Sequence, residues 1–332
     1  MNRLRSPQRG AAIVAALLMV ALVAGLSVAA FWQQWRGIEV ESAQRQALQA
    51  QWLITGAMDW ARAQVGEDGV RSPQVDHGGE AWAQVVQDLP LDAFVQASPA
   101  GANAQPAAET AGGDARLDLR ITDAQGRINV LNLLEGQSLS PAWMTVFRRL
   151  FDTLGLPVSE LNRLAEQLRR ASLGTAPAGG PTVSGTDIAL MPTRQADLAW
   201  LGLAPATVQA LAPHVSLLPG RLPVNLNTAS APVLQAVLGL ETAPLQQLLA
   251  QRQVQPFATL AAAGLKAPDA QMQSVNSHFF EVHIALRLNR SAAWVQEEHA
   301  LLQRDGRDVR TLWQRRERPS PAASAGPART PP

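Results

Sequence analysis

The chain has 332 residues, a net charge of +1 from 28 basic and 27 acidic side chains, and no cysteine. Its length predicts one large domain with an insertion or two domains, and its near-neutral charge argues against a strong polyanion-binding surface. The lack of cysteine excludes disulfides, thiolate metal sites and a cysteine nucleophile, but it is compatible with export from the cytoplasm.

The N-terminus combines a basic leader with a long apolar segment. Three arginines among the first ten residues precede an uncharged run, 11–32, which as a helix extends about 33 Å and can span a bilayer. Basic residues before such a segment predict a cytoplasmic N-terminus and a periplasmic body. The run is too long for an ordinary cleaved secretory signal. It is therefore either an uncleaved signal anchor or the anchor of a chain whose leader is removed after Gly10.

A basic leader that ends in Arg9-Gly10 and is followed directly by an apolar helix resembles the prepilin peptidase substrates of pili and type II secretion. The resemblance implies cleavage after Gly10 and N-methylation of Ala11. Ala15 then occupies the fifth mature position, where most pilins carry a glutamate that pairs with a neighbouring subunit. Because a carboxylate in hydrocarbon is costly without a partner, its absence is expected of a subunit with no neighbour beyond it.

An apolar stripe continues past the membrane segment. It predicts a helix that runs to residue 65, over about 80 Å, with one face packed on a protein core. The stripe consists of Ala43, Ala47, Ala50, Ile54, Ala57, Met58, Ala61 and Val65. A helix that starts in lipid and then packs against a sheet is the pilin plan, although an anchor followed by a soluble stalk fits the same periodicity.

The rest of the chain predicts a sheet interrupted by helices. Residues 116–121 alternate as a strand before a turn at 123–126, and helical periodicity then runs from 140 to 273. The predicted helices are 143–154, 158–171, 195–201, 205–211, 232–238 and 243–251, and the predicted C-terminal strands are 279–288, 293–303 and 309–315. This order indicates an α+β fold in which the long helix packs on an antiparallel sheet that carries an inserted all-helical subdomain.

The leader, Ala15, the element order and the motif VNLNTASAPVLQAVLGL at 224–240 together resemble the minor pseudopilin K family of type II secretion. TDAQGRINVLNL at 122–133 and SVNSHFFEV at 274–282 support the resemblance, which covers nearly the whole chain. It implies a non-enzymatic inner-membrane subunit at the tip of the pseudopilus, which supports export of folded proteins. The implied partners are minor pseudopilins I and J, then H and the major pseudopilin G. The family also implies calcium, whose ligands the sequence does not assign.

The domain order follows from the elements and the resemblance together. We expect a leader at 1–10, a transmembrane helix at 11–32, the periplasmic part of the long helix at 33–65, the first part of the sheet domain at 66–139, a helix-hairpin-helix or SAM-like insertion at 140–273, strands at 274–316 and a disordered tail at 317–332.

The same motif allows a rival interpretation, because an INLNTA-like segment before two short helices also occurs in DNA-binding helix-hairpin-helix proteins. Those hairpins offer backbone amides to phosphates through glycine-rich turns. Here the turn keeps one glycine, Gly239, followed by Glu241, and only Arg252 and Lys266 add positive charge nearby. A partner other than nucleic acid is therefore favoured. A type IV pilus minor pilin and a signal-anchored periplasmic binding module remain alternatives.

In the favoured interpretation the motif is structural. Asn225 and Asn227 are predicted to fix a turn through side-chain bonds to the backbone, while Thr228 or Ser230 caps the next helix.

No catalytic or metal-binding set is predicted from the five histidines. His278 and His283 are five residues apart, so a strand would send them to opposite faces, and His299 is interpreted as a surface residue. Trp32 and Trp35 suit a membrane interface. Most of the remaining tryptophans are interpreted as packing residues, including Trp52, Trp143 and Trp200.

Overall fold

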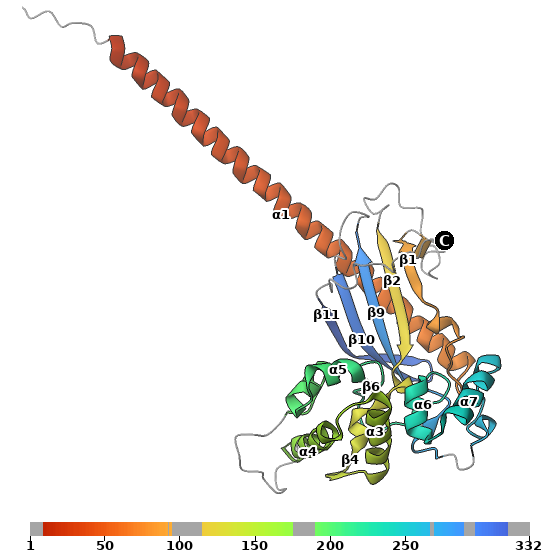
Figure 1. The fold of residues 1–332 in the computed structure, drawn as a ribbon. Coiled ribbons are helices and arrows are strands. Elements are labelled where there is room, and N and C mark those ends of the chain that lie inside the picture. Colours follow the sequence, from red (N-terminus) through yellow and green to blue (C-terminus); the bar gives the residue numbers. More distant parts are fainter. Residues whose placement is uncertain are drawn as a thin grey trace, which may run out of the picture. The chain divides into compact units, whose positions relative to one another are not determined.

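The computed structural model describes residues 9–91, 93–94, 115–174, 190–265, 269–288 and 296–317. The first eight residues of the predicted leader and residues 318–332 of the predicted tail lie outside this set. The chain divides into two units, Met1–Thr55 and Gly56–Pro332, which are described separately (Figure 1). We call the described part of the second unit, residues 56–317, the head.

The described part of the first unit is helical. Helix α1 spans Arg9–Arg71 without a break, which confirms the predicted helix through residue 65. The large apolar side chains from Ile13 to Val40 are each more than half exposed, and Trp32 contacts Trp35 edge to face at 6.0 Å. The most apolar window of the helix has a mean hydropathy of 2.7, so α1 is long and apolar enough to cross a membrane.

The head is built on a five-stranded antiparallel sheet (Figure 1). The strands lie in the order β1 (Val86–Pro90), β2 (Arg116–Asp123), β9 (Phe279–Arg287), β10 (Gln296–Asp305) and β11 (Asp308–Glu317). The predicted strand at 116–121 and the three C-terminal strands are confirmed. Strand β1 was not predicted, because an irregular register between Val86 and Leu89 and a positive φ of 46° at Asp88 interrupt its alternation.

One face of the sheet packs against residues 56–71 of α1. Leu117, Leu119 and Ile121 of β2 are buried on alternate positions, as a half-buried strand requires. The stripe members of the head, Ala57, Met58, Ala61 and Val65, are also buried. A Cβ at Gly69 would lie 2.1 Å from the carbonyl oxygen of Gly306, so only glycine lets α1 approach the β10–β11 turn this closely.

Helices α3 to α7 lie between β2 and β9 in the chain, although these two strands are neighbours in the sheet. We call residues 141–263 the helical block; it lies at one end of the sheet (Figure 1). It contains α3 (Pro141–Leu154), α4 (Val158–Gly174), η5 (Gln195–Leu201), α5 (Pro205–Leu211), α6 (Ala231–Leu238), α7 (Thr242–Val254) and η6 (Ala261–Ala263). All six predicted helices are present, the third as a 3₁₀ helix.

The helical block has its own apolar core, which includes Trp143, Phe147 and Phe151 of α3. Trp143 is buried, as predicted, but Trp200 is 61% exposed and Trp52 is 74% exposed, so the packing predictions for these two were wrong. In the three-residue period of η5, Leu198 and Leu201 face the core and Trp200 does not.

Short strands connect the helical block to the sheet. Strands β3 (Ile128–Asn129) and β6 (Val215–Ser216) pair in parallel, as do β7 (Val224–Asn225) and β8 (Gln273–Ser274), while β4 (Leu134–Glu135) and β5 (Ser138–Leu139) form a hairpin. The helix η4 (Val130–Leu133) follows β3, and η1 (Ala81–Ala83) precedes β1. The β7–β8 pair brings the VNLNTAS segment beside the chain that re-enters the sheet.

Candidate functional site

A buried hydrogen-bonded cluster joins the helical block to the sheet, and we call its members Asp76, Asp123, Asn225, Thr228 and Ser277 the polar junction. The Asp123 carboxylate is its centre. Its Oδ2 accepts hydrogen bonds from Asn225 Nδ2 at 2.9 Å, Thr228 Oγ1 at 2.5 Å and Ser277 Oγ at 2.6 Å. Asn225 Nδ2 also donates to the backbone oxygen of Asp76 at 3.1 Å.

The junction forms where three segments that are distant in the sequence meet: the turn after β2, the VNLNTAS segment and the residues just before β9. Asp123 ends β2 and caps the turn η3 (Ala124–Gly126), where its Oδ1 accepts from Gln125 N at 2.7 Å. Asn225 belongs to β7, and Ser277 precedes β9. A Cβ at Gly126 would lie 2.8 Å from Thr228 Oγ1, so glycine permits the turn to touch the VNLNTAS segment.

The motif residues make backbone bonds of the kind predicted for them. Asn225 Oδ1 accepts from Asn227 N at 2.9 Å, and Asn227 bonds both the backbone N and O of Phe257, at 2.8 and 3.0 Å. The capping prediction needs correction. Ser230 is the N-cap of α6 but makes no side-chain capping bond, and the Thr228 hydroxyl donates to Asp123 instead.

A buried ion cluster lies next to the junction. Arg304 of β10 donates through Nη1 to Asp68 Oδ2 at 2.9 Å and through Nη2 to both carboxylate oxygens of Asp76 at 2.7 Å. These three residues are at most 4% exposed. The guanidinium also stacks over the Phe280 ring at 4.7 Å. Arg304 therefore ties the end of α1 to the sheet.

Among the described residues, this part of the head also holds the carboxylate group that is the best candidate for the calcium site implied by the resemblance. Asp68, Asp76 and Glu80 offer carboxylate oxygens within 4.8 Å of one another. Calcium needs six to eight oxygen ligands, but here the oxygens of two aspartates bind the guanidinium of Arg304, and Glu80 Oε2 accepts from Trp82 Nε1. The cluster does not fit calcium as it stands, and calcium stays an untested expectation.

Burial gives the cluster a pH dependence. Burial raises the pKa of Asp76 to about 7, although Arg304 and the Ser277 N–H oppose the shift. The folded chain therefore binds this proton more tightly than the unfolded chain, whose aspartate keeps a pKa near 3.8. The contribution of this proton to stability is complete below about pH 4 and is lost as the pH rises through about 7.

In wild type, release of this proton should lower the unfolding free energy by a few kcal/mol between about pH 4 and pH 8. We expect Asp76→Asn, which cannot ionise, to remove this part of the pH dependence. Chemical unfolding of the detergent-solubilised chain at several pH values measures the slope. Asp152→Asn, at an exposed position of α3, serves as the control and should leave the slope unchanged. Parallel profiles for wild type and Asp76→Asn would contradict the assignment.

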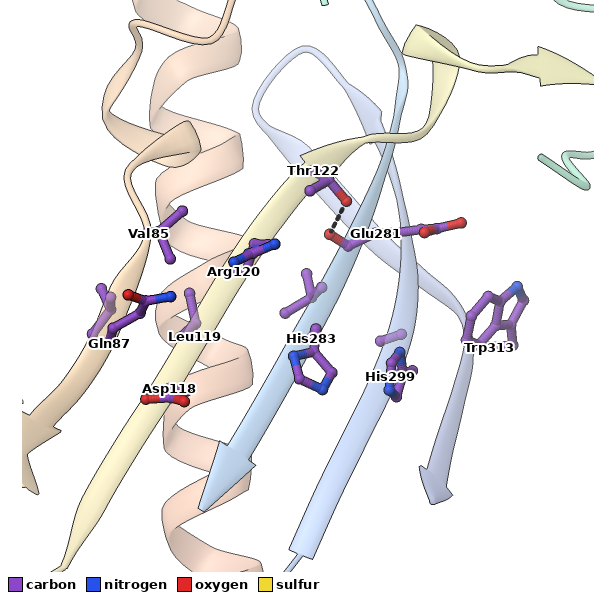
Figure 2. Close-up of a pocket in the computed structure, with 13 residues that line it drawn as sticks. Val85, Gln87, Asp118, Leu119, Arg120, Thr122, Glu281, His283, His299 and Trp313 are labelled. Atoms are coloured by element: carbon purple, nitrogen blue, oxygen red, sulfur yellow. Dashed lines mark hydrogen bonds between the residues drawn. The ribbon is translucent and has the colours of Figure 1, made fainter. Parts of the chain in front are cut away.

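The opposite, outer face of the sheet holds a groove of about 410 Å³ (Figure 2). Its residues come from β2, β9, β10 and β11 and from the segment around β1. His283 and His299 lie side by side on neighbouring strands, with Arg120, Glu281 and Trp313 nearby (Figure 2). His299, which was predicted to be a surface strand residue, is a partly exposed residue of β10, and the β9–β10 register pairs it with His283.

The hairpin between α6 and α7 bears on the rival DNA-binding interpretation. Gly239 has a left-handed φ of 64°, and Arg149 of α3 lies against it. Arg252 Nη1 donates to the backbone oxygens of Leu226 and Ala229 at 2.9 and 2.6 Å, so this guanidinium is engaged within the protein. Lys266 lies outside the described residues. Within the described residues 231–254, Arg252 is the only basic residue, and its contacts to the backbone leave it poorly placed for phosphate binding.

The predicted processing residues lie at the start of α1. Gly10 and Ala11 belong to its first turns, but the structure describes side-chain environments only from Ala12 onward. Ala15 is exposed on the helix. Cleavage, methylation and the role of Ala15 therefore stay predictions.

Comparison with known proteins agrees with these features. Residues 126–220 and 224–283 match two family models, both described as type II secretion system protein K. The type II secretion system protein K of Pseudomonas aeruginosa is 29% identical over 266 residues, with 75% of this chain and 74% of that protein covered.

The fold is also similar to that of a solved structure. A chain in the crystal structure of the GspK-GspI-GspJ complex from the enterotoxigenic Escherichia coli type 2 secretion system aligns with a TM-score of 0.57 and 17% identity, covering 83% of this chain and 98% of that chain. The matched ranges begin at Gly126, the last residue of the turn that follows Asp123, and they include the VNLNTAS segment. In the structure this segment meets the turn, where Thr228 donates a hydrogen bond to Asp123. These comparisons show that the chain is similar to protein K of the type II secretion system, over residues 126–220 and 224–283 in the family models and over 75% of its length in the relative from Pseudomonas aeruginosa.

Proposed function

We propose that this chain is a minor pseudopilin that occupies the tip of a type II secretion pseudopilus, where it initiates or caps fibre assembly and supports export of folded proteins. The observation that carries the proposal is the helical block, which is inserted in the sequence between β2 and β9 and is joined to the sheet by hydrogen bonds of the polar junction. A body of that size on the sheet domain would hinder addition of another subunit above it. The role is assembly, with no reaction catalysed.

Helix α1 is the proposed anchor and assembly element. Its exposed apolar side chains from Ile13 to Val40 suit lipid and neighbouring helices, and its alanines and glycines permit close helix packing. The basic leader favours an orientation with the N-terminus in the cytoplasm and the head in the periplasm of a bacterial inner-membrane protein.

The proposed partners follow from the solved relative. The similar chain belongs to a complex of GspK, GspI and GspJ, so we infer that this chain assembles with minor pseudopilins I and J. Minor pseudopilin H and the major pseudopilin G would follow below them. Nucleic acid is a weaker partner candidate because Arg252 is engaged by backbone oxygens.

Processing by the prepilin peptidase gives a direct prediction. We expect the mature chain to start at N-methylated Ala11, and Gly10→Leu to leave residues 1–10 attached because the side chain obstructs the scissile peptide. Mass spectrometry of N-terminal peptides from membrane fractions measures both, with cells lacking the peptidase as the control. A wild-type chain that keeps its leader while the peptidase is active would support the plain signal anchor instead.

Two deletions test the proposed role. Loss of the whole chain should retain type II substrates in the periplasm while surface pili remain, whereas loss of pili would favour a type IV pilus minor pilin. Loss of residues 141–263 should spare membrane insertion but produce fibres that start or extend abnormally. Deletion of residues 318–332 is the control and should change neither. Unchanged secretion and fibre length without the helical block would count against the tip role.

A further inference from the structure

A second cluster lies on the outer face of the sheet, where two of its members, His283 and His299, line the groove; it is independent of the polar junction and of the proposed assembly role. His283 of β9 and His299 of β10 are directly paired across the strands, with ring centroids 4.4 Å apart. Glu297 precedes His299 by two residues on β10 and therefore points to the same face. One ring nitrogen of each histidine and one oxygen of Glu297 all lie within 4.8 Å of one another.

Glu297 is the member that needs a partner. Its side chain is 5% exposed, and within the described part of the chain its Oε1 has no hydrogen-bond donor. A buried carboxylate oxygen without a partner is destabilising, and a bound cation would offset that cost.

The two imidazoles suit the same cation. The rings of His283 and His299 lie side by side on neighbouring strands, so a nitrogen of each can face the same ion (Figure 2). A neutral imidazole has a free nitrogen lone pair, which is the form that ligates metals.

We propose that His283, His299 and Glu297 together bind one divalent transition-metal ion of the zinc type on the outer face of the sheet. Two imidazoles and one carboxylate are a known three-ligand set for zinc, with a fourth position left to water. Ligand atoms around tetrahedral zinc are roughly 3.3 to 3.5 Å apart. The candidate ligand atoms lie within 4.8 Å of one another, so any pair further apart than this spacing would have to move closer when the ion binds.

The surroundings agree with an imidazole-rich site. Glu317 Oε2 lies 3.8 Å from His299 Nε2, and a carboxylate beside a ligating histidine orients the ring in many zinc sites. Calcium prefers oxygen ligands alone, so this cluster differs from the calcium site that the family resemblance implies. The ion would join β9 to β10 at the floor of the groove.

Zinc binding by the full chain in detergent, purified without a histidine tag, tests the proposal. Titration against a zinc-binding indicator dye should give one ion per chain. His283→Gln and His299→Gln should each weaken binding by at least about 100-fold, since loss of a ligand exceeds the loss of an outer-shell partner. His77→Gln, which removes a histidine at a different place in the head, is the matched control and should bind as wild type does.

Two further readouts keep the test independent of folding. Glu297→Gln preserves the shape of the buried side chain and, because it removes a charged ligand, should also weaken zinc binding by at least about 100-fold. Cobalt, as a spectroscopic substitute, should give the visible absorption of a tetrahedral site in wild type and in His77→Gln only. Wild type that binds no zinc, or variants at 283, 297 and 299 that bind as tightly as wild type, would overturn the proposal.

Discussion

Replacing Arg304 by methionine is expected to destabilise the head by about 3 to 5 kcal/mol at neutral pH, because it leaves two buried carboxylates without their cation. Asp68 and Asp76 are at most 3% exposed, and both direct carboxylate oxygens at the guanidinium. Methionine fills much of the same volume, so the loss measures the broken ion cluster more than a cavity.

The pH dependence separates this explanation from a packing defect. Burial raises the pKa values of Asp68 and Asp76, so both carboxyls of the variant become neutral more readily as the pH falls. The loss caused by Arg304→Met should therefore be smaller at about pH 5 than at about pH 8. Denaturant unfolding of wild type, Arg304→Met and the exposed control Arg310→Met measures it. A loss under 1 kcal/mol, or one that does not change with pH, would contradict the expectation.

Replacing Asp123 by alanine is expected to cost about 3 to 5 kcal/mol and to loosen the helical block from the sheet. The buried donors of Asn225 and Ser277 and the half-buried hydroxyl of Thr228 would lose their shared acceptor, and each unsatisfied buried donor costs about 1 to 3 kcal/mol. Because Asp123 stands at the end of β2, the effect should spread to both bodies that it joins.

Limited proteolysis and chemical unfolding together measure this effect. Asp123→Ala should expose cleavage sites between the sheet and the helical block, at a lower denaturant concentration than wild type. Asp123→Asn retains one acceptor oxygen and should lose less, while Asp152→Ala on the exposed side of α3 should lose almost nothing. Wild-type stability in Asp123→Ala would show that the junction does not join the two bodies.

Much of the fold could be predicted because its signals are local. The helices of the block have strong periodicity and recognisable starts, such as Pro141 after Ser140 and Pro232 in the first turn of α6. Strand β11 alternates regularly between exposed and half-buried residues. Strand β1 escaped prediction because the positive φ at Asp88 breaks its alternation.

The buried clusters could not be predicted because their members are far apart in the chain. Arg304 meets Asp68 and Asp76 across 236 and 228 residues, and no local pattern links them. The pairing of His283 with His299 had a usable signal, because a hairpin centred near the predicted turn at 289–291 places residues 283, 297 and 299 on one face. Comparing His283 only with His278, which lies just before β9, missed it.

The measurement that tests the tip role most directly is disulfide cross-linking in cells. The chain contains no cysteine, so Leu22→Cys on the exposed apolar surface of α1 gives a single reporter. Matching cysteines would be placed at the same depth in minor pseudopilins I and J and in the major pseudopilin G.

A subunit at the tip should form adducts with I or J, and no adduct between two copies of this chain. Adducts between copies, or adducts with G alone, would place the chain within the fibre rather than at its end and would contradict the proposed function.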